Sequence, residues 1–546
     1  AKRVTDIKAF KKAVERADAW SFTARPLDLA ETIEFWNVNE KIGSRLDLIR
    51  ASIDKRLEER DQDRADANPI SKDRIREGAR LVAAAATLAK ESAIRVPDGQ
   101  QNERGLPIKE VLTDWNDADC RTLLTRPIFD EGIYGTVRFH HRSVREFLTA
   151  EWLNAMLVDE GSRAKIENLF FRRQYGIEVV VPTMRPLLPW LALLDRRILE
   201  RIMRLAPEVL FEGGDPAQLP VDTRAQILRE TCEQLTQPAH GRSATEYSAV
   251  QRFTNPDLAE CIRELLDKHS GDEDIVWFLL RMAQQGGIAA LADRAKDFAL
   301  TSRGKYTRAA AIRALIEVGS PQDIAEVREA FIAEAPPLRR SWLSELVGSL
   351  GQTRDDVDWL LTALALAAPK KRYETDPLTD TLASYVAGLP PTLLPTLLDG
   401  LAKLLGRRPV IEQGHCEISE RYSWLAQAAG ETLVIMIGLR DPITLKKTAL
   451  ATLRKLSTAE DYGRTVFGGE RNELPQRIRG WPALNRAVFW HSVATERARR
   501  KRKNGERLTN YWHVSIFSSY WAFDGSDFDY VRDEIAARPL LDDKLV

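Results

Sequence analysis

A repeat of helical hairpins constrains the fold of this chain most strongly. Turns centred on Gly287, Gly319 and Gly351 follow one another at intervals of 32 residues. Each turn lies between two apolar segments with helical periodicity. One helical hairpin cannot bury its own apolar stripe, whereas stacked hairpins share a continuous core. The ankyrin and TPR signatures are missing, so the repeat predicts a HEAT-like α-solenoid, and the alternative is an irregular helical bundle.

The first 160 residues follow a different pattern. Helical periodicity marks segments that begin near Ile7, Leu29, Leu46 and Ser71, and Pro26 ends the first of them. Two short helical stretches, two strand-like stretches and a long helix then follow in order, at 108–115, 118–124, 127–129, 133–139 and 141–157. Asp130-Glu131-Gly132 separates the two strand-like stretches and predicts a hairpin turn. These are the parts of a winged-helix unit.

Charge and composition exclude several classes of protein. Lys plus Arg is 80 and Asp plus Glu is 80, so bulk charge cannot drive binding to a polyanion. A local basic run remains, and either it contacts nucleic-acid phosphates or it is a solvated helix end, which is the favoured interpretation. Its residues are Arg499, Arg500, Lys501, Arg502 and Lys503. No apolar stretch is long enough to span a bilayer and no signal peptide is present, which predicts a cytoplasmic protein.

No catalytic or metal-binding signature occurs in the sequence. A Walker A loop, a Walker B acid, and the patterns H-E-x-x-H, G-x-S-x-G and C-x-x-C are all missing. The four cysteines are widely spaced, and His415-Cys416 is the only neighbouring His-Cys pair. We therefore expect buried thiols, no catalytic residue, no metal site and no cofactor within this chain.

One segment carries a specific resemblance. The stretch from Val137 to Trp152, V-R-F-H-H-R-S-V-R-E-F-L-T-A-E-W, resembles the motif F-x-H-x-x-x-x-E-[FY]-x-A-A. This motif ends the winged-helix domain of NACHT-type STAND NTPases, the NLR-like signalling switches. The positions that match it are Phe139, His141, Glu146, Phe147 and Ala150. Thr149 departs from the motif, where Ala is commoner.

A second segment supports the same resemblance. Trp20 to Trp36, W-S-F-T-A-R-P-L-D-L-A-E-T-I-E-F-W, is similar to the stretch where a NACHT domain passes into its helical domain. The T-x-R-P part contains Arg25 and Pro26. The order of helical domain, winged helix and solenoid is that of bacterial NACHT proteins, and the specific likeness covers about residues 1–160.

The resemblance implies a nucleotide-dependent switch. Family members bind ATP or ADP with magnesium between the NACHT core and the winged helix, and the motif His contacts the β-phosphate. His141 and Arg25 are then the candidate nucleotide contacts, and Phe139, Glu146 and Phe147 are switch-motif positions. A solenoid sensor binds a protein trigger, and the activated protein forms a homo-oligomer. Because this chain lacks a P-loop, we expect the NACHT core and an effector domain upstream of Ala1.

The resemblance and the repeat together predict a mainly α fold in four parts. These are a helical domain at 1–100, a winged helix at 101–160, a HEAT-like solenoid at 161–480 and a basic, aromatic helical block at 481–546, which continues beyond the chain. The leading hypothesis is the switch and sensor portion of an antiphage defence ATPase. The alternatives are a non-enzymatic α-solenoid scaffold and a winged-helix nucleic-acid-binding protein.

Structural roles compete with the functional ones at each candidate residue. His141 could be an ordinary structural histidine at a helix start, and Arg25 could form a plain interdomain salt bridge. Phe147 fits a core position, and Glu146 fits an i,i+4 pair with Arg142. His140 is expected to face outward from its strand.

Overall fold

A computed structural model describes most of the chain. The described residues are 4–17, 19–39, 42, 44–58, 68–97, 105–133, 135–236, 247–370, 377–411, 416–460, 473–503 and 520–537. The chain divides into two compact units, Ala1–Ala295 and Lys296–Val546. The structure is 72% helix and 5% strand, which confirms the predicted mainly α fold class.

The first unit begins with three helices. They are α1 (Ile7–Arg16), α2 (Pro26–Asn39) and α3 (Arg45–Leu57). Pro26 occupies the first position of α2, where its missing N–H costs nothing. Asp28 therefore lies in the first turn of α2, two residues inside the helix. Its carboxylate favours the positive end of the helix dipole there.

A small sheet with its helices follows. The elements are α5 (Lys72–Leu88), β1 (Ile94–Arg95), β2 (Leu106–Pro107), α6 (Ile108–Val111), α7 (Asp117–Leu124), β3 (Phe129–Glu131), β4 (Thr136–Phe139) and α8 (Arg142–Met156). The strand order is β2-β1-β4-β3. Strand β4 pairs antiparallel with β3 on one side and with β1 on the other. Strand β1 lies before the predicted domain boundary at residue 100, and yet it belongs to this sheet. Its two residues pair with the edge of β4 that β3 leaves free.

The hairpin and the long helix occur where the sequence predicts them. Asp130 and Glu131 pair with Arg138 and Val137, so they belong to strand β3 and not to the turn. Helix α5 packs along α8. Helix α5 approaches Trp115 and α7 closely at Gly78, where an added Cβ would lie 2.7 Å from the Trp115 ring and 3.0 Å from Leu123 of α7.

The remainder of the first unit is helical apart from a second hairpin. Its elements are α9 (Glu160–Phe170), β5 (Phe171–Gln174), β6 (Ile177–Val180), α10 (Leu188–Ala192), α11 (Arg196–Leu205), α12 (Val209–Glu212), α13 (Val221–Leu235), α14 (Tyr247–Phe253), α15 (Ala259–Lys268) and α16 (Glu273–Gly286). The β5–β6 hairpin was not predicted, because Phe171 is its one buried residue and its strands lack a regular apolar alternation.

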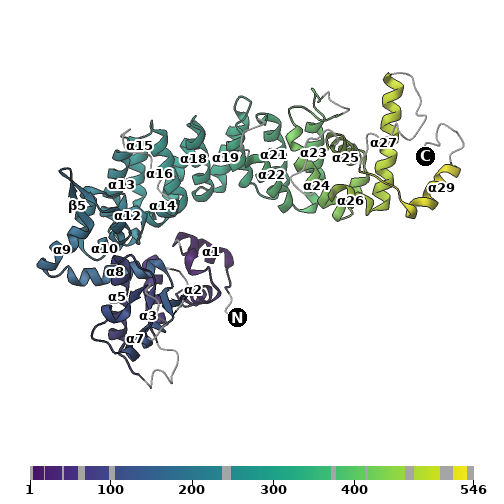
Figure 1. Ribbon diagram of the computed structural model, residues 1–546. Coiled ribbons are helices and arrows are strands. Elements are labelled where there is room, and N and C mark those ends of the chain that lie inside the picture. Colours follow the sequence, from purple (N-terminus) through teal and green to yellow (C-terminus); the bar gives the residue numbers. More distant parts are fainter. Residues whose placement is uncertain are drawn as a thin grey trace. The chain divides into compact units, whose positions relative to one another are not determined.

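The second unit is a two-layered array of helices. In chain order these are α18 (Lys305–Val318), α19 (Pro321–Ala333), α20 (Arg340–Gly348), α21 (Arg354–Leu366), α22 (Pro377–Gly388), α23 (Leu394–Leu405), α24 (Ala426–Gly438), α25 (Lys447–Glu460), α26 (Glu473–Arg479), α27 (Pro482–Lys503) and α29 (Phe528–Ala537). Helix α17 (Ala292–Thr301) spans the division between the units. Even-numbered helices from α18 to α26 contact one another in succession, and so do odd-numbered helices from α19 to α27 (Figure 1). This alternation is the arrangement of an α-solenoid.

The repeat recurs at the level of single contacts. Ser320 and Asp323 form a capping box at the start of α19, and Thr353 and Asp356 form the same box at the start of α21. Each cap aspartate also accepts a bond of 3.1 Å from a cation on the preceding odd-numbered helix, Lys296 for Asp323 and Arg328 for Asp356. Each such ion pair joins consecutive odd-numbered helices, so the repeat fixes their spacing.

Aromatic side chains pack together in the described part of the basic, aromatic block at 481–546. Phe489 on α27 contacts Trp521 at 4.8 Å and Phe523 at 5.0 Å between ring centroids. Tyr511, Trp512 and Phe517, which belong to the same block of the sequence, lie outside the described residues.

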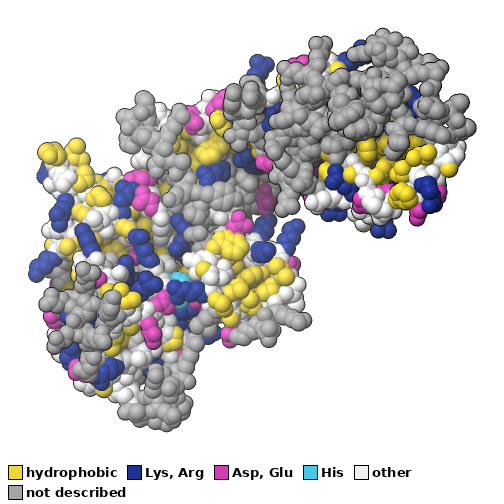
Figure 2. Space-filling view, turned by 45° about the vertical axis from the view of Figure 1, so that its right-hand side comes forward, with side chains coloured by type: hydrophobic (Ala, Val, Ile, Leu, Met, Phe, Trp, Pro, Cys, Tyr) yellow, Lys and Arg dark blue, Asp and Glu magenta, His cyan; other side chains and the backbone are white. Residues whose placement is uncertain are grey.

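The cysteines, the apolar helices and the distribution of charge can each be compared with what the sequence suggested. All four cysteines are free and buried, as expected. Among the described helices, none combines the length and the apolar character that crossing a membrane requires. Basic and acidic side chains are interspersed on the visible face of the first unit, in keeping with the balanced charge (Figure 2).

The turn after α16 allows a first prediction. Gly287 has a left-handed backbone with φ of 58°, which L-residues adopt at a cost of roughly 1–2 kcal/mol. We expect Gly287→Ala to lower the free energy of unfolding by about 1 kcal/mol in urea denaturation. Gly271→Ala is the matched control, because a Cβ at Gly271 meets open space. Equal stability of the two variants would contradict the assigned strain.

Candidate functional site

The two motif segments meet where the end of β4 contacts the start of α2. Arg25 directly precedes α2, Phe139 ends β4, and His141 is the N-cap residue of α8. The Arg25 guanidinium donates to both carboxylate oxygens of Asp130, at 3.1 and 2.9 Å. The same nitrogen lies 2.9 Å from Nδ1 of His140. Segments separated by more than 100 residues of sequence therefore share one polar cluster, which we call the α2–β4 cluster.

His140 is the centre of this cluster. Its Nδ1 lies 2.6 Å from Oδ1 of Asp130, and its Nε2 lies 2.9 and 3.1 Å from Oδ1 and Oδ2 of Asp28. Its side chain is 7% exposed, so the expectation of an outward-facing residue was wrong. His140 does lie on the face of the hairpin opposite the apolar face. Helix α2 contacts it there through Asp28, so this position is not solvated. Both ring nitrogens therefore face carboxylate oxygens.

Asp28 and Arg56 form a buried ion pair beside His140. Their side chains are 1% and 3% exposed. Arg56, near the end of α3, also bonds Glu31 at 3.0 Å and the carbonyl of Pro127 at 3.1 Å. Burial raises the pKa of Asp28, but the bonds and charges of His140 and Arg56 outweigh it, so the pKa lies below its ordinary value. Asp130 follows the same pattern, with His140 and Arg25 as its partners.

The His141 side chain packs against the cluster and is 12% exposed, and its buried Nε2 forms no hydrogen bond within the described structure. This atom lies 3.6 Å from Oδ2 of Asp28, beyond hydrogen-bonding distance. The ring packs on Phe22 at 4.6 Å and on His140 at 4.3 Å between centroids. Burial and then the neighbouring His140 lower the pKa of His141 to about 4, against an opposing effect of Asp28. His141 is therefore neutral near pH 7.

The three switch-motif residues, Phe139, Glu146 and Phe147, have structural contacts within this unit. Phe139 contacts Phe129 at 4.7 Å across the hairpin. Phe147 is fully buried and contacts Trp190 of α10 at 5.6 Å. Glu146 accepts a bond of 2.7 Å from Arg142, which confirms the expected i,i+4 pair.

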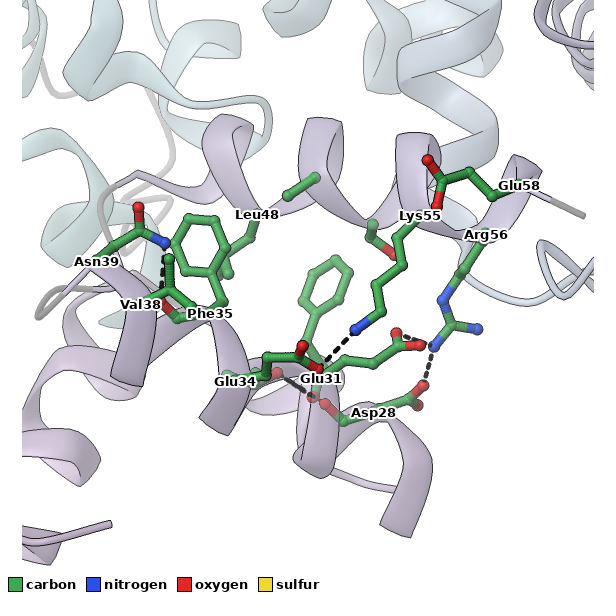
Figure 3. Close-up of a pocket in the computed structure, with 14 residues that line it drawn as sticks. Asp28, Glu31, Glu34, Phe35, Val38, Asn39, Leu48, Lys55, Arg56 and Glu58 are labelled. Carbon is green, nitrogen blue, oxygen red and sulfur yellow. Dashed lines mark hydrogen bonds and ion pairs between the residues drawn. The ribbon is translucent and has the colours of Figure 1, made fainter. Parts of the chain in front are cut away.

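A pocket opens beside the cluster between α2 and α3. It has a volume of ≈330 Å³, and Figure 3 shows its charged side chains toward one end and the apolar Phe35, Val38 and Leu48, together with Asn39, toward the other. Lys55 bonds Glu34 at 2.8 Å across it, and Arg56 bonds Asp28 and Glu31. Both cations of the pocket are thus paired with carboxylates, so in this arrangement the pocket does not present them to an anion.

The structure leaves the predicted basic patch untested. Arg499, Arg500, Lys501, Arg502 and Lys503 form the last part of α27, and their side chains lie outside the described residues. His415 lies outside them as well.

The cluster contains four residues that the sequence did not single out as site residues, namely Asp28, Arg56, Asp130 and His140. Asp28, Arg56 and Asp130 carry no local signature, and only their long-range partners reveal them. The signal that could have directed attention to them is the neighbouring pair His140-His141 after a strand, since two adjacent histidines on a covered edge need acidic partners.

Comparison with known proteins adds no relative. The chain matches no model of a protein family, no curated protein and no solved structure.

His141 allows a prediction of pH dependence. Its folded-state pKa of about 4 lies below the ordinary 6.5, so between these values only the unfolded chain binds the proton. The contribution of His141 to stability is complete above pH 6.5 and is lost as the pH falls toward 4. Asp28 and Asp130 have lowered pKa values, so their contribution disappears only below about pH 3.8.

Urea denaturation near pH 7 and near pH 5 measures this effect. We expect a loss of about 2 kcal/mol from His141 across that interval. Between the same two pH values, the free energy of unfolding of His141→Gln should fall by less than that of the wild type, and the difference should be about the same 2 kcal/mol. His491, whose pKa is also lowered, is present in both proteins and cancels in the comparison. An identical loss in the two proteins would contradict the assignment.

Proposed function

We propose that this chain is the switch and sensor portion of a bacterial NACHT-type STAND ATPase of an antiphage defence system. In this proposal an upstream core binds ATP or ADP with magnesium, and the solenoid binds a protein trigger in the cytoplasm. Trigger binding shifts the equilibrium between a closed and an open state, and the open state forms a homo-oligomer.

The order and topology of the first unit support the proposal. A long helix, two short strands, two short helices and a hairpin follow one another from α5 to β4, and β4 lies between β1 and β3. A winged helix has the same order of a helix, a strand, two helices and a hairpin, to which β2 adds an outer strand here. Its hairpin leads into α8, which carries the motif. The repeated helical hairpins beyond it supply the kind of surface that solenoid sensors use.

The observation that carries the proposal is the α2–β4 cluster. Arg25 of the T-A-R-P segment and His140 beside the motif histidine meet around Asp130. An apolar core would hold these elements together more simply, because desolvating charges offsets most of what their pairing contributes. A cluster of exchangeable ion pairs suits a junction that must adopt two arrangements.

His141 is the group that we propose couples this junction to nucleotide. In the described structure its Nε2 faces an anionic oxygen of Asp28 at 3.6 Å. A nucleotide phosphate presents the same kind of oxygen. We propose that His141 exchanges between Asp28 in the nucleotide-free arrangement and the β-phosphate in the closed state.

An α-solenoid scaffold without enzymatic activity remains the second candidate. The two-layered helical array of the second unit favours it, because such arrays commonly act as protein–protein platforms. In that case the α2–β4 cluster would be a fixed structural contact.

ADP affinity of the protein that includes the proposed upstream core separates the two candidates. We expect His141→Ala to weaken ADP binding by about 10–100-fold, as loss of a hydrogen bond to a charged group does. Basal activity should rise because the closed state is weakened. Arg142→Ala is the control, since this neighbouring side chain is 71% exposed. The switch proposal would be wrong if the upstream region had no Walker A loop, or if the two variants bound ADP with equal affinity. The α-solenoid scaffold would then be the remaining candidate.

A further inference from the structure

Three potential metal ligands converge in the α2–β4 cluster. Oδ2 of Asp28 lies 3.1 Å from Nε2 of His140 and 3.6 Å from Nε2 of His141. All three residues offer ligand atoms within 4.8 Å of one another. In a tetrahedral zinc site with bonds of about 2.0–2.1 Å, neighbouring ligand atoms lie roughly 3.4 Å apart. Both distances to the Asp28 oxygen are therefore within a few tenths of an ångström of a metal-binding geometry.

The two oxygens of Asp28 have different surroundings. Oδ1 accepts from Arg56 and also lies 2.9 Å from Nε2 of His140. Oδ2 lies 3.1 Å from the same nitrogen and 3.6 Å from Nε2 of His141. Arg56 thus holds the carboxylate in place through Oδ1, while Oδ2 faces both histidines. The positive charges of Arg56 and Arg25 are offset by Glu31 and Asp130, which bond them directly.

His140 has the second partner that metal-ligating histidines usually have. Asp130 lies 2.6 Å from Nδ1, on the ring edge opposite Asp28. A carboxylate in that place fixes the Nδ1–H tautomer and directs the Nε2 lone pair at the ion. Without an ion, that lone pair would face the Asp28 carboxylate unless the ring carried a second proton.

His141 supplies an independent observation. Its Nε2 is buried, and within the described structure it has no hydrogen-bond partner. Most buried polar atoms in proteins have a partner, so one that lacks it requires an explanation. Phe22 and His140 pack on the ring and direct this atom toward Asp28. A cation between the three ligand atoms would satisfy it.

We propose that Asp28, His140 and His141 bind one divalent transition-metal ion of the zinc type, with Asp130 positioning His140. Two imidazoles and one carboxylate suit Zn²⁺ or Co²⁺, whereas Mg²⁺ and Ca²⁺ prefer oxygen ligands. The remaining position is open to water. The ion links α2 to the end of β4 and stabilises their contact. This inference does not require the proposed switch function.

The test uses the 546-residue chain, stripped with EDTA and titrated with ZnCl₂ alone by calorimetry. We expect the wild type to bind one more Zn²⁺ per chain than His141→Ala or Asp28→Asn. Asp130→Asn should keep the site but weaken its affinity by about 10–100-fold. Substituting Co²⁺ should give visible absorption bands of a low-coordinate site, and these should be missing in His141→Ala. MgCl₂ in excess should not compete.

Two controls separate this site from other histidines. His491→Ala removes a histidine of α27, and His415→Ala removes the one beside Cys416. Neither should change the zinc stoichiometry. Far-ultraviolet circular dichroism checks that each variant folds, and Asp130→Asn carries the test if His141→Ala does not fold. Unchanged zinc affinity in His141→Ala and Asp130→Asn, or loss of the ion in His415→Ala instead, would overturn the site, as would a wild type that binds no zinc.

Discussion

Phe147→Ala is expected to lower the free energy of unfolding by about 3–5 kcal/mol, the usual cost of truncating a buried phenylalanine. Phe147 is fully buried and joins three helices. Its ring meets Trp190 of α10 edge to face, and the guanidinium of Arg50 on α3 lies 5.8 Å from its centroid. The cavity left by alanine would separate α8 from both neighbours. Urea denaturation followed by tryptophan fluorescence measures the effect.

Phe528→Ala is the control for this prediction. Phe528 begins α29 and is 68% exposed, so its truncation should change stability by no more than about 0.5 kcal/mol. A loss below about 1 kcal/mol for Phe147→Ala would contradict the packing of α8 described here. The expected result would also show that Phe147 stabilises the core, so that no ligand contact is needed to explain a phenylalanine at this motif position.

Arg56→Met is expected to cost about 3–5 kcal/mol, as removal of one partner from a buried ion pair usually does. It removes the arginine partner of the buried Asp28 carboxylate, which is 1% exposed, and it also removes one partner of Glu31. The double variant Asp28→Asn/Arg56→Met should recover part of the loss, because the uncompensated charge is gone. Equilibrium unfolding of the two single variants and the double variant gives the coupling energy.

The neighbouring residue provides a matched control. Lys55 pairs with Glu34 at 2.8 Å, but the side chains are 39% and 45% exposed. Exposed pairs contribute little, so Lys55→Met should cost no more than about 1 kcal/mol. Equal losses for Arg56→Met and Lys55→Met would mean that the Asp28–Arg56 pair is not the buried support of the cluster.

Local patterns were enough to predict most of the elements. Pro26 was expected to end the first helix, but α1 ends at Arg16 and Pro26 begins α2. The hairpin and α8 follow from alternation and helical periodicity. The solenoid was predictable because the apolar stripes recur at a fixed interval. Its three glycines are less alike than their spacing suggests, since only Gly287 has a positive φ and Gly319 has φ of −84°. The cap aspartates, Asp323 and Asp356, are the more regular feature.

The candidate site was less predictable, because its contacts join residues far apart in the sequence. His141 and Arg25 were identified from the resemblance, but the residue that connects their segments is His140. Strand alternation places it opposite Phe139, on the face that would be solvated in an isolated hairpin. Nothing local indicates that α2 covers this face and brings Asp28 to it, 112 residues away. Strands β1 and β2 were also missed, since two residues are too few for a periodic signal.

Hydrogen–deuterium exchange of the protein that includes the proposed nucleotide-binding core tests the switch most directly. Peptides that contain Arg25 and Asp28, and peptides that contain His140 and His141, should exchange at different rates with ADP and with a non-hydrolysable ATP analogue. Peptides of α5, which packs along α8, should exchange alike in both states. If the α2–β4 cluster exchanged at the same rate with either nucleotide, it would be a fixed structural contact and the switch proposal would be wrong.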